Sequence, residues 1–186
     1  MSMGGLKREP VFVYEVIGVV FIIFLGSLLH FTFEWSGHQP IVGPFSAINE
    51  SVWEHLKLGF WPALLYAIVE YRFVKKTAKN YLPAKTLSVY VIPIVIVVTF
   101  YSYTTVTGES IFILDILTFV VAVAVGQLSS YKLLTYRKLS GNLGRMSIVA
   151  LAVLGLAFVA FTFYPPHLPI FQDPVSGQYG IINHPH

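Results

Sequence analysis

Residues 49–57 read Asn-Glu-Ser-Val-Trp-Glu-His-Leu-Lys and open an apolar run that continues to Tyr71. The stretch brings three charged side chains, a histidine, an asparagine and a tryptophan to the start of a segment long enough to cross a bilayer. Charged groups inside a membrane span are costly, so they usually face a bundle interior or a watery cavity and often mark function. The stretch therefore predicts a polar site inside a helical membrane protein.

The spacing within this stretch predicts which side chains share a helix face. Glu50, Glu54 and Lys57 are spaced i, i+4, i+7 and fall on one face of an ideal helix. We expect this stripe to face the bundle interior, because a charge facing lipid near mid-bilayer costs about 2.5–3.5 kcal/mol. His55 lies roughly 100° from Glu54 and leaves this face if the first turn is regular. The run resembles the inverted zinc-protease signature H-x-x-E-H, but Ser51 occupies the first histidine position and excludes that motif.

Composition fixes the broad class of the chain. Of its 186 residues, 55% are hydrophobic and only 11% are charged, outside the usual range of soluble globular proteins. Several apolar segments reach the length of about 20 residues that a helix needs to cross a bilayer. We predict an all-α, polytopic transmembrane helical bundle forming a single domain, 1–186. Its five spans are expected at about 11–32, 50–71, 86–103, 111–130 and 146–164.

The basic residues predict the orientation. With five spans, eleven of the twelve Lys and Arg residues fall on one side, and Lys57 is the exception. The positive-inside rule then predicts a multi-pass protein of the cell membrane with its N-terminus inside and its C-terminus outside. Because the basic residues cluster at span ends without a separate basic domain, a nucleic-acid partner is excluded. All six histidines and six of the nine acids fall on the outer side, so the inner halves of the spans are expected to be nearly free of polar side chains.

Several helices are thus expected to bring imidazoles and carboxylates to one depth near the outer face. Such a mixed nitrogen and oxygen set suits a divalent metal such as zinc, and the absence of cysteine excludes thiolate ligands and disulfides. The candidate metal ligands are His30, Glu34, Glu54 and His167. The candidate catalytic residues, as a general base on metal-bound water, are Glu50 and Asp115. The candidate residues for binding a small molecule or cation at the outer face are Asn49, Trp53, Glu54 and Lys57.

Each candidate also has a structural interpretation. A single pair such as His30 and Glu34 is more often an interhelix hydrogen bond than a metal site. Asp115 suits the positive N-terminal end of its helix. Trp53 fits an interfacial aromatic belt.

The end of the chain is expected to form an ordered outer tail at 165–186. It carries apolar residues that would seek burial over the mouth of the bundle: Leu168, Ile170, Phe171, Tyr179 and Ile181. The motif NESVWEHLK at 49–57 and the tail PHLPIFQDPVSGQYGI at 166–181 resemble an uncharacterised family of small prokaryotic multi-pass integral membrane proteins. The resemblance covers nearly the whole chain. It implies the membrane topology and adds no activity.

Three functions remain open from the sequence. The first is a membrane-embedded, metal-dependent hydrolase acting near the outer leaflet. The second is a solute-binding subunit of a transporter, since an acidic, aromatic-lined pocket suits a small cation. The third is a scaffold protein whose polar cluster only locks the helices together. The sequence assigns neither a substrate nor enzymatic activity.

Overall fold

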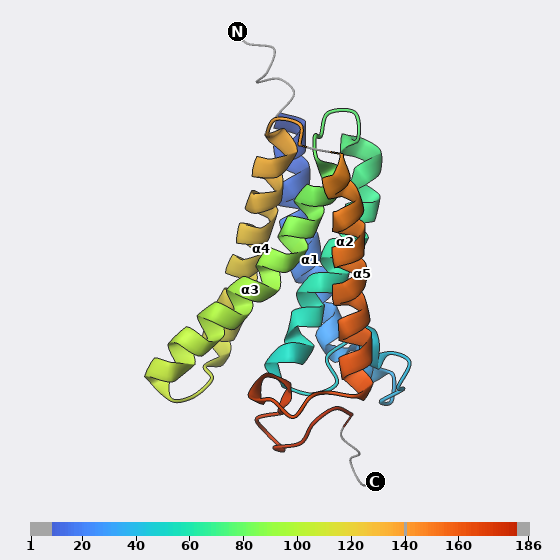
Figure 1. The fold of residues 1–186 in the computed structure, drawn as a ribbon. Helices are drawn as coiled ribbons and strands as arrows, with labels where there is room; N and C mark the ends of the chain where they lie inside the picture. The colour runs from blue at the N-terminus through green and yellow to red at the C-terminus, as the bar shows by residue number, and fades with distance from the viewer. Residues whose placement is uncertain (1–8, 140, 182–186) are drawn as a thin grey trace.

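Five long helices make up most of the described part of the protein (Figure 1). A computed structural model describes residues 9–139 and 141–181, and this part of the chain contains an isolated bridge between Gln172 and Tyr179 but no strand. The prediction of an all-α fold is confirmed. The helices are α1 (Glu9–Trp35), α2 (Val52–Val74), α3 (Tyr81–Thr107), α4 (Phe112–Thr135) and α5 (Asn142–Phe163), with 3-10 helices η1 (Gly43–Phe45) and η2 (Pro169–Phe171).

The helices run up and down a common long axis, so their ends meet at two faces (Figure 1). α2 packs against α1, α3 and α5, and also contacts both 3-10 helices. We call the face where α1 and α5 end and α2 begins the tail end, because the chain after α5 folds across it. At this face α3 and α4 diverge from the other helices and form a separate hairpin tip.

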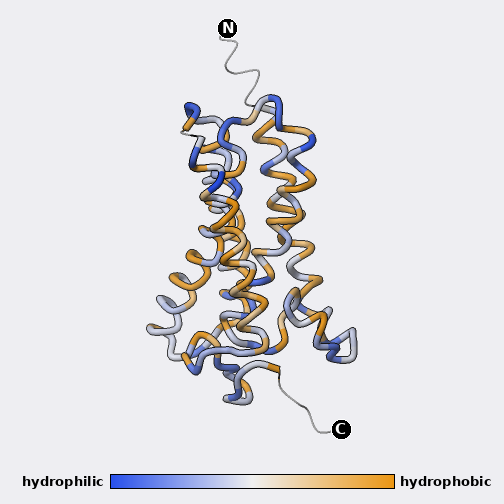
Figure 2. Tube along the Cα trace, turned by 45° about the vertical axis from the view of Figure 1, so that its right-hand side comes forward, coloured by the Kyte–Doolittle hydropathy of each residue, from blue (hydrophilic) through white to orange (hydrophobic). Residues whose placement is uncertain are grey.

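Four of the five helices are long and apolar enough to cross a membrane, namely α1, α3, α4 and α5. Helix α2 is the exception, because Glu54, Lys57, Glu70 and Arg72 lower its hydropathy. Apolar residues occupy the middle of the bundle and hydrophilic ones gather toward its two faces (Figure 2). These properties indicate an integral membrane protein in which the most polar helix is packed against three apolar ones.

Close helix approaches at glycine hold the middle of the bundle together. A Cβ atom on Gly26 would lie 2.5 Å from the Leu58 carbonyl oxygen, and one on Gly126 would lie 2.6 Å from a side-chain carbon of Ile92. A side chain at either glycine would therefore push two helices apart. Ile92 is fully buried there, within the main apolar core.

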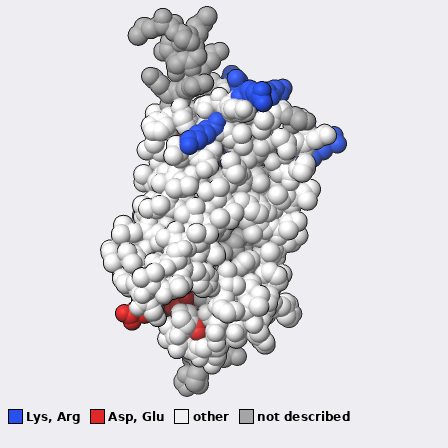
Figure 3. All heavy atoms as spheres, turned by 60° about the vertical axis from the view of Figure 1, so that its left-hand side comes forward, with Lys and Arg blue, Asp and Glu red and all other residues white. Residues whose placement is uncertain are grey.

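On the surface, basic and acidic residues lie at opposite faces of the bundle (Figure 3). Lys and Arg gather at the face opposite the tail end, while Asp and Glu appear toward the tail end on the side shown. Lys57 lies near the tail end and is buried. Of the basic residues used to predict the orientation, Lys7 and Arg8 lie outside the described residues, as do residues 182–186 of the expected tail.

Two helix starts differ from the expected spans in ways that change where charged residues lie. α2 begins at Val52, so Glu50 precedes the helix. α3 begins at Tyr81, so Lys85 lies inside the helix and is buried, although the sequence placed it in a loop. The contacts of Glu50 and of Lys85 are described below.

Candidate metal centre

Two histidines and one glutamate meet at the tail end. His30 lies near the end of α1, His55 lies in the first turn of α2, and Glu50 lies in the loop just before α2. The Nε2 atoms of His30 and His55 are 3.2 Å apart. One carboxylate oxygen of Glu50 lies 3.4 Å from His55 Nε2 and 3.8 Å from His30 Nε2. These three residues, called the triad below, each offer a ligand atom within 4.8 Å of the others.

The start of α2 explains how Glu50 and His55 come together. Ser51 is the N-cap, and its side chain accepts a hydrogen bond from the Glu54 backbone N–H. Because the residue before an N-cap lies outside the helix, Glu50 is not held to the 100° helical spacing. Its backbone N–H donates to Asp173 Oδ1 at 3.1 Å, which joins this loop to the tail. The Glu50 carboxylate consequently reaches His55 instead of continuing the Glu54 face.

A second contact orients the His55 ring. Its Nδ1 lies 2.9 Å from the Ser51 carbonyl oxygen. Since a carbonyl oxygen only accepts, Nδ1 must carry the proton in this hydrogen bond. The other ring nitrogen, Nε2, faces His30 and Glu50. While protonated it donates to the Glu50 carboxylate, and loss of that proton would free its lone pair for a metal ion. Backbone carbonyls commonly orient metal-binding histidines in this way.

The carboxylates of the loop and the tail are both held in their charged form. The hydrogen bond with His55 holds the pKa of the Glu50 carboxyl below its ordinary value, against the opposing effect of partial burial. Burial alone would raise the pKa of Asp173, but hydrogen bonds from Ser176 and from the Glu50 amide hold it below its ordinary value. Half of the Glu50 side chain, 51%, stays exposed, so the triad is open to the surroundings on that side.

Glu54 and Lys57 form a separate buried ion pair one turn further along α2. Their side chains are 3% and 0% exposed. Lys57 Nζ also donates to the Gly43 carbonyl oxygen at 2.7 Å and to Thr162 Oγ1 at 3.0 Å. Glu54 also accepts a hydrogen bond from the Ile48 backbone N–H at 3.1 Å. Both residues face the bundle interior, and their polar atoms bind the protein itself.

Asn49 and Trp53 contact the tail. The Asn49 side chain donates to the Gly180 carbonyl oxygen at 2.9 Å. The Trp53 ring lies 4.7 Å from the ring of Phe171 and 4.8 Å from that of Phe158, measured between centroids. These contacts place both residues in the joint between α2 and the tail.

The other three candidates are not members of the triad, although the charge of Glu34 acts on His30. Glu34 is exposed on α1 beyond His30, and His167 is exposed with its ring against Tyr179. Asp115 accepts hydrogen bonds from Tyr103 and Ser110 at the α3–α4 tip, where these helices diverge from the bundle. The expected meeting of Asp115 with the α2 stripe is therefore absent from the structure.

The face opposite the tail end contains a buried charged cluster that the sequence prediction missed. Glu15, Glu70 and Lys85 come from three different helices and are at most 4% exposed. The expectation that these halves of the spans are nearly free of polar side chains is wrong. The sequence did contain a signal for this cluster, because Glu15 and Glu70 lie within apolar runs and a buried carboxylate requires a partner.

Comparison with known proteins identifies the family of the chain but assigns no chemistry to it. No curated protein and no solved structure matches the chain. A family model matches residues 6–181, which include the 49–57 stretch and the 166–181 motif. The chain belongs to this family of unknown function, DUF6512.

Proposed function

We propose that this integral membrane protein binds one divalent transition-metal ion, zinc by preference, through the triad at its outer face. The observation that carries the proposal is the convergence of three ligand atoms from α1, α2 and the loop between them within 4.8 Å. Two imidazoles and one carboxylate form a mixed nitrogen and oxygen set that suits zinc.

The distances between the ligand atoms of the triad fit a tetrahedrally coordinated zinc ion. Zinc binds nitrogen and oxygen ligands at about 2.0–2.2 Å, which places tetrahedral ligand atoms roughly 3.3–3.6 Å from each other. The separations in the triad are 3.2, 3.4 and 3.8 Å. The ligand atoms thus need only small shifts to coordinate an ion at their centre.

The charges around the triad also favour a bound cation. Glu50 remains ionised because its pKa is lowered, and Asp173 adds a second negative charge through its contact with the Glu50 amide. A cation would also lie between the Nε2 atoms of the two histidines, which are 3.2 Å apart. A divalent ion would therefore join α1 to α2 and, through Asp173, to the tail.

Metal binding is supported better than hydrolysis. A hydrolase needs a carboxylate beside the metal-bound water as general base. Glu50 would serve as a ligand, Glu54 is paired with Lys57, and Asp173 accepts from Ser176. Asp115 belongs to the separate α3–α4 tip. These four carboxylates are thus engaged in ligation or in other contacts, whereas Glu34 on α1 is exposed and interacts electrostatically with His30.

Metal analysis of the purified protein tests the proposal. The full chain in detergent micelles would be stripped with EDTA, dialysed against excess zinc buffered at a low free concentration and measured for bound metal. We expect one zinc ion per chain, its loss in His55→Ala and His30→Ala, and its retention in His167→Ala, the matched control. Equal zinc in wild type and His55→Ala would contradict the triad, and loss in His167→Ala would indicate a different ligand set.

A further inference from the structure

The cluster of Glu15, Glu70 and Lys85 is buried, yet its charges do not balance. Lys85 Nζ donates to Glu15 Oε1 at 2.7 Å and also pairs with Glu70. Two carboxylates and one ammonium leave a formal charge of −1 among residues that are 3%, 1% and 4% exposed. An unpaired buried charge is expensive, and such sites take up a proton or a counter-ion.

The hydrogen bonds leave room for one more proton. Ser130 Oγ donates to Glu15 Oε1 at 2.9 Å, and the Tyr81 hydroxyl lies 3.0 Å from Glu70 Oε2. All described donors therefore reach one oxygen of each carboxylate. The other two oxygens, Glu15 Oε2 and Glu70 Oε1, are buried without a hydrogen-bond partner. Two free acceptors beside one excess negative charge fit the binding of a proton.

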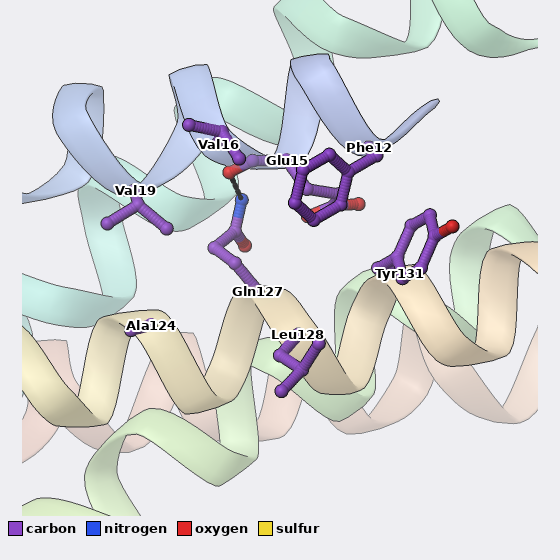
Figure 4. A pocket seen from close by; sticks show the side chains of 8 residues that line it. All are labelled: Phe12, Glu15, Val16, Val19, Ala124, Gln127, Leu128 and Tyr131. Atoms are coloured by element: carbon purple, nitrogen blue, oxygen red, sulfur yellow. Dashed lines mark hydrogen bonds between the residues drawn. The ribbon is translucent and has the colours of Figure 1, made fainter. Parts of the chain in front are cut away.

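A cavity beside Glu15 offers a route for that proton (Figure 4). It lies between α1 and α4 and has a volume of about 90 Å³. Glu15 and Gln127 contribute to its wall, and Phe12 and Tyr131 stand at one side. The cavity is large enough to admit water, whose polar neighbours there would be Glu15 and Gln127. Water there would reach the carboxylate from the side of α4.

We propose that Glu15, Glu70 and Lys85 form a proton-binding site that holds one exchangeable proton per chain on its two carboxylates. The proton enters through the cavity between α1 and α4. The bound species is a proton shared by the two carboxylates, both of which pair with Lys85. The titratable side chains around Glu15 are Tyr66 and Glu70 from α2, Tyr81 and Lys85 from α3, and Tyr131 from α4.

Infrared spectroscopy of the full chain in lipid vesicles tests the site. At neutral pH the wild type is expected to show the carbonyl stretch of one protonated carboxylic acid, shifted in D₂O. Either Glu15→Gln or Glu70→Gln should abolish this band, because the remaining carboxylate then balances Lys85. Glu109→Gln, which removes an exposed acid, should leave it unchanged. A wild type without the band, or a band that survives both cluster substitutions, would overturn the proposal.

The cavity is tested separately. Ala124→Leu adds volume at the cavity wall without touching the carboxylates. We expect the acid band to remain and its exchange in D₂O to slow at least several-fold. An unchanged exchange rate would overturn the cavity as the route, and the spectra of the two glutamine variants would still decide the proton site.

Discussion

Breaking the buried pair between Glu54 and Lys57 should be among the most damaging changes to stability outside the apolar core. Lys57 is fully buried and binds Glu54, the Gly43 carbonyl and Thr162, so it connects α2 with η1 and α5. Lys57→Met leaves the Glu54 carboxylate buried with one backbone donor, from Ile48. Removing one partner of a buried ion pair costs about 3–5 kcal/mol, because the other charge is left uncompensated.

The double variant gives the sharper result. Glu54→Gln alone strands the Lys57 ammonium, so we expect a similar cost of about 3–5 kcal/mol. Combining Glu54→Gln with Lys57→Met removes both charges and should cost no more than either single change. If the two single costs simply added, the double variant would lose roughly 6–10 kcal/mol.

Equilibrium unfolding in mixed micelles measures these free energies. Tryptophan fluorescence is a suitable signal, because Trp53 packs against Phe158 and Phe171 close to the pair. If the losses in unfolding free energy of the two single variants added in the double variant, the broken ion pair would not be the cause of the destabilisation. Glu54→Gln should also keep its zinc, and loss of zinc in a folded Glu54→Gln protein would restore Glu54 as a metal ligand.

Three further predictions concern the metal, the tail and the topology. Saturating zinc at 100 times its dissociation constant should stabilise the EDTA-stripped protein by about 2.7 kcal/mol in a thermal unfolding assay, and acid should remove this gain because the ligands take up protons. Asp173→Ala removes the acceptor of the Glu50 and Ser176 amides, so limited proteolysis should cut the tail faster than in wild type. Because the folded-state pKa of Asp173 lies below the ordinary 3.8, the wild-type tail should resist protease above that pH and lose protection as pH falls through the folded value. Lys76→Cys and Val175→Cys, both at exposed positions, should react with a membrane-impermeant thiol reagent from opposite sides, and labelling from one side would contradict the predicted orientation.

The helices were largely predictable, because hydropathy and helix-breaking residues are local properties. Four apolar runs became four helices of suitable length, and α2 formed where the 49–57 stretch meets its apolar continuation. The first residue of α2 was also readable. Ser51 followed three residues later by Glu54 is a capping pattern, which indicates a helix beginning at Val52 and places Glu50 outside it.

The partners of each charged residue could not be read from the sequence in the same way. Whether His30 meets His55 depends on the rotation of α1 relative to α2 and on the shift between them along their axes. The hydropathy pattern determines neither quantity. Lys85 looked like a loop residue because its neighbourhood is basic. Its burial depends on Glu15 and Glu70, which are 70 and 15 positions earlier in the chain. Such long-range pairs follow from the packing of the whole bundle.

X-ray absorption at the zinc edge of the zinc-loaded protein tests the metal site most directly. The triad predicts a first shell of two imidazole nitrogens and one carboxylate oxygen at about 2.0–2.2 Å, completed by a further light atom. His55→Ala should retain at most one imidazole in that shell. A wild-type spectrum without imidazole scattering, or one unchanged by His55→Ala, would contradict the assignment of His30, Glu50 and His55 as the metal ligands.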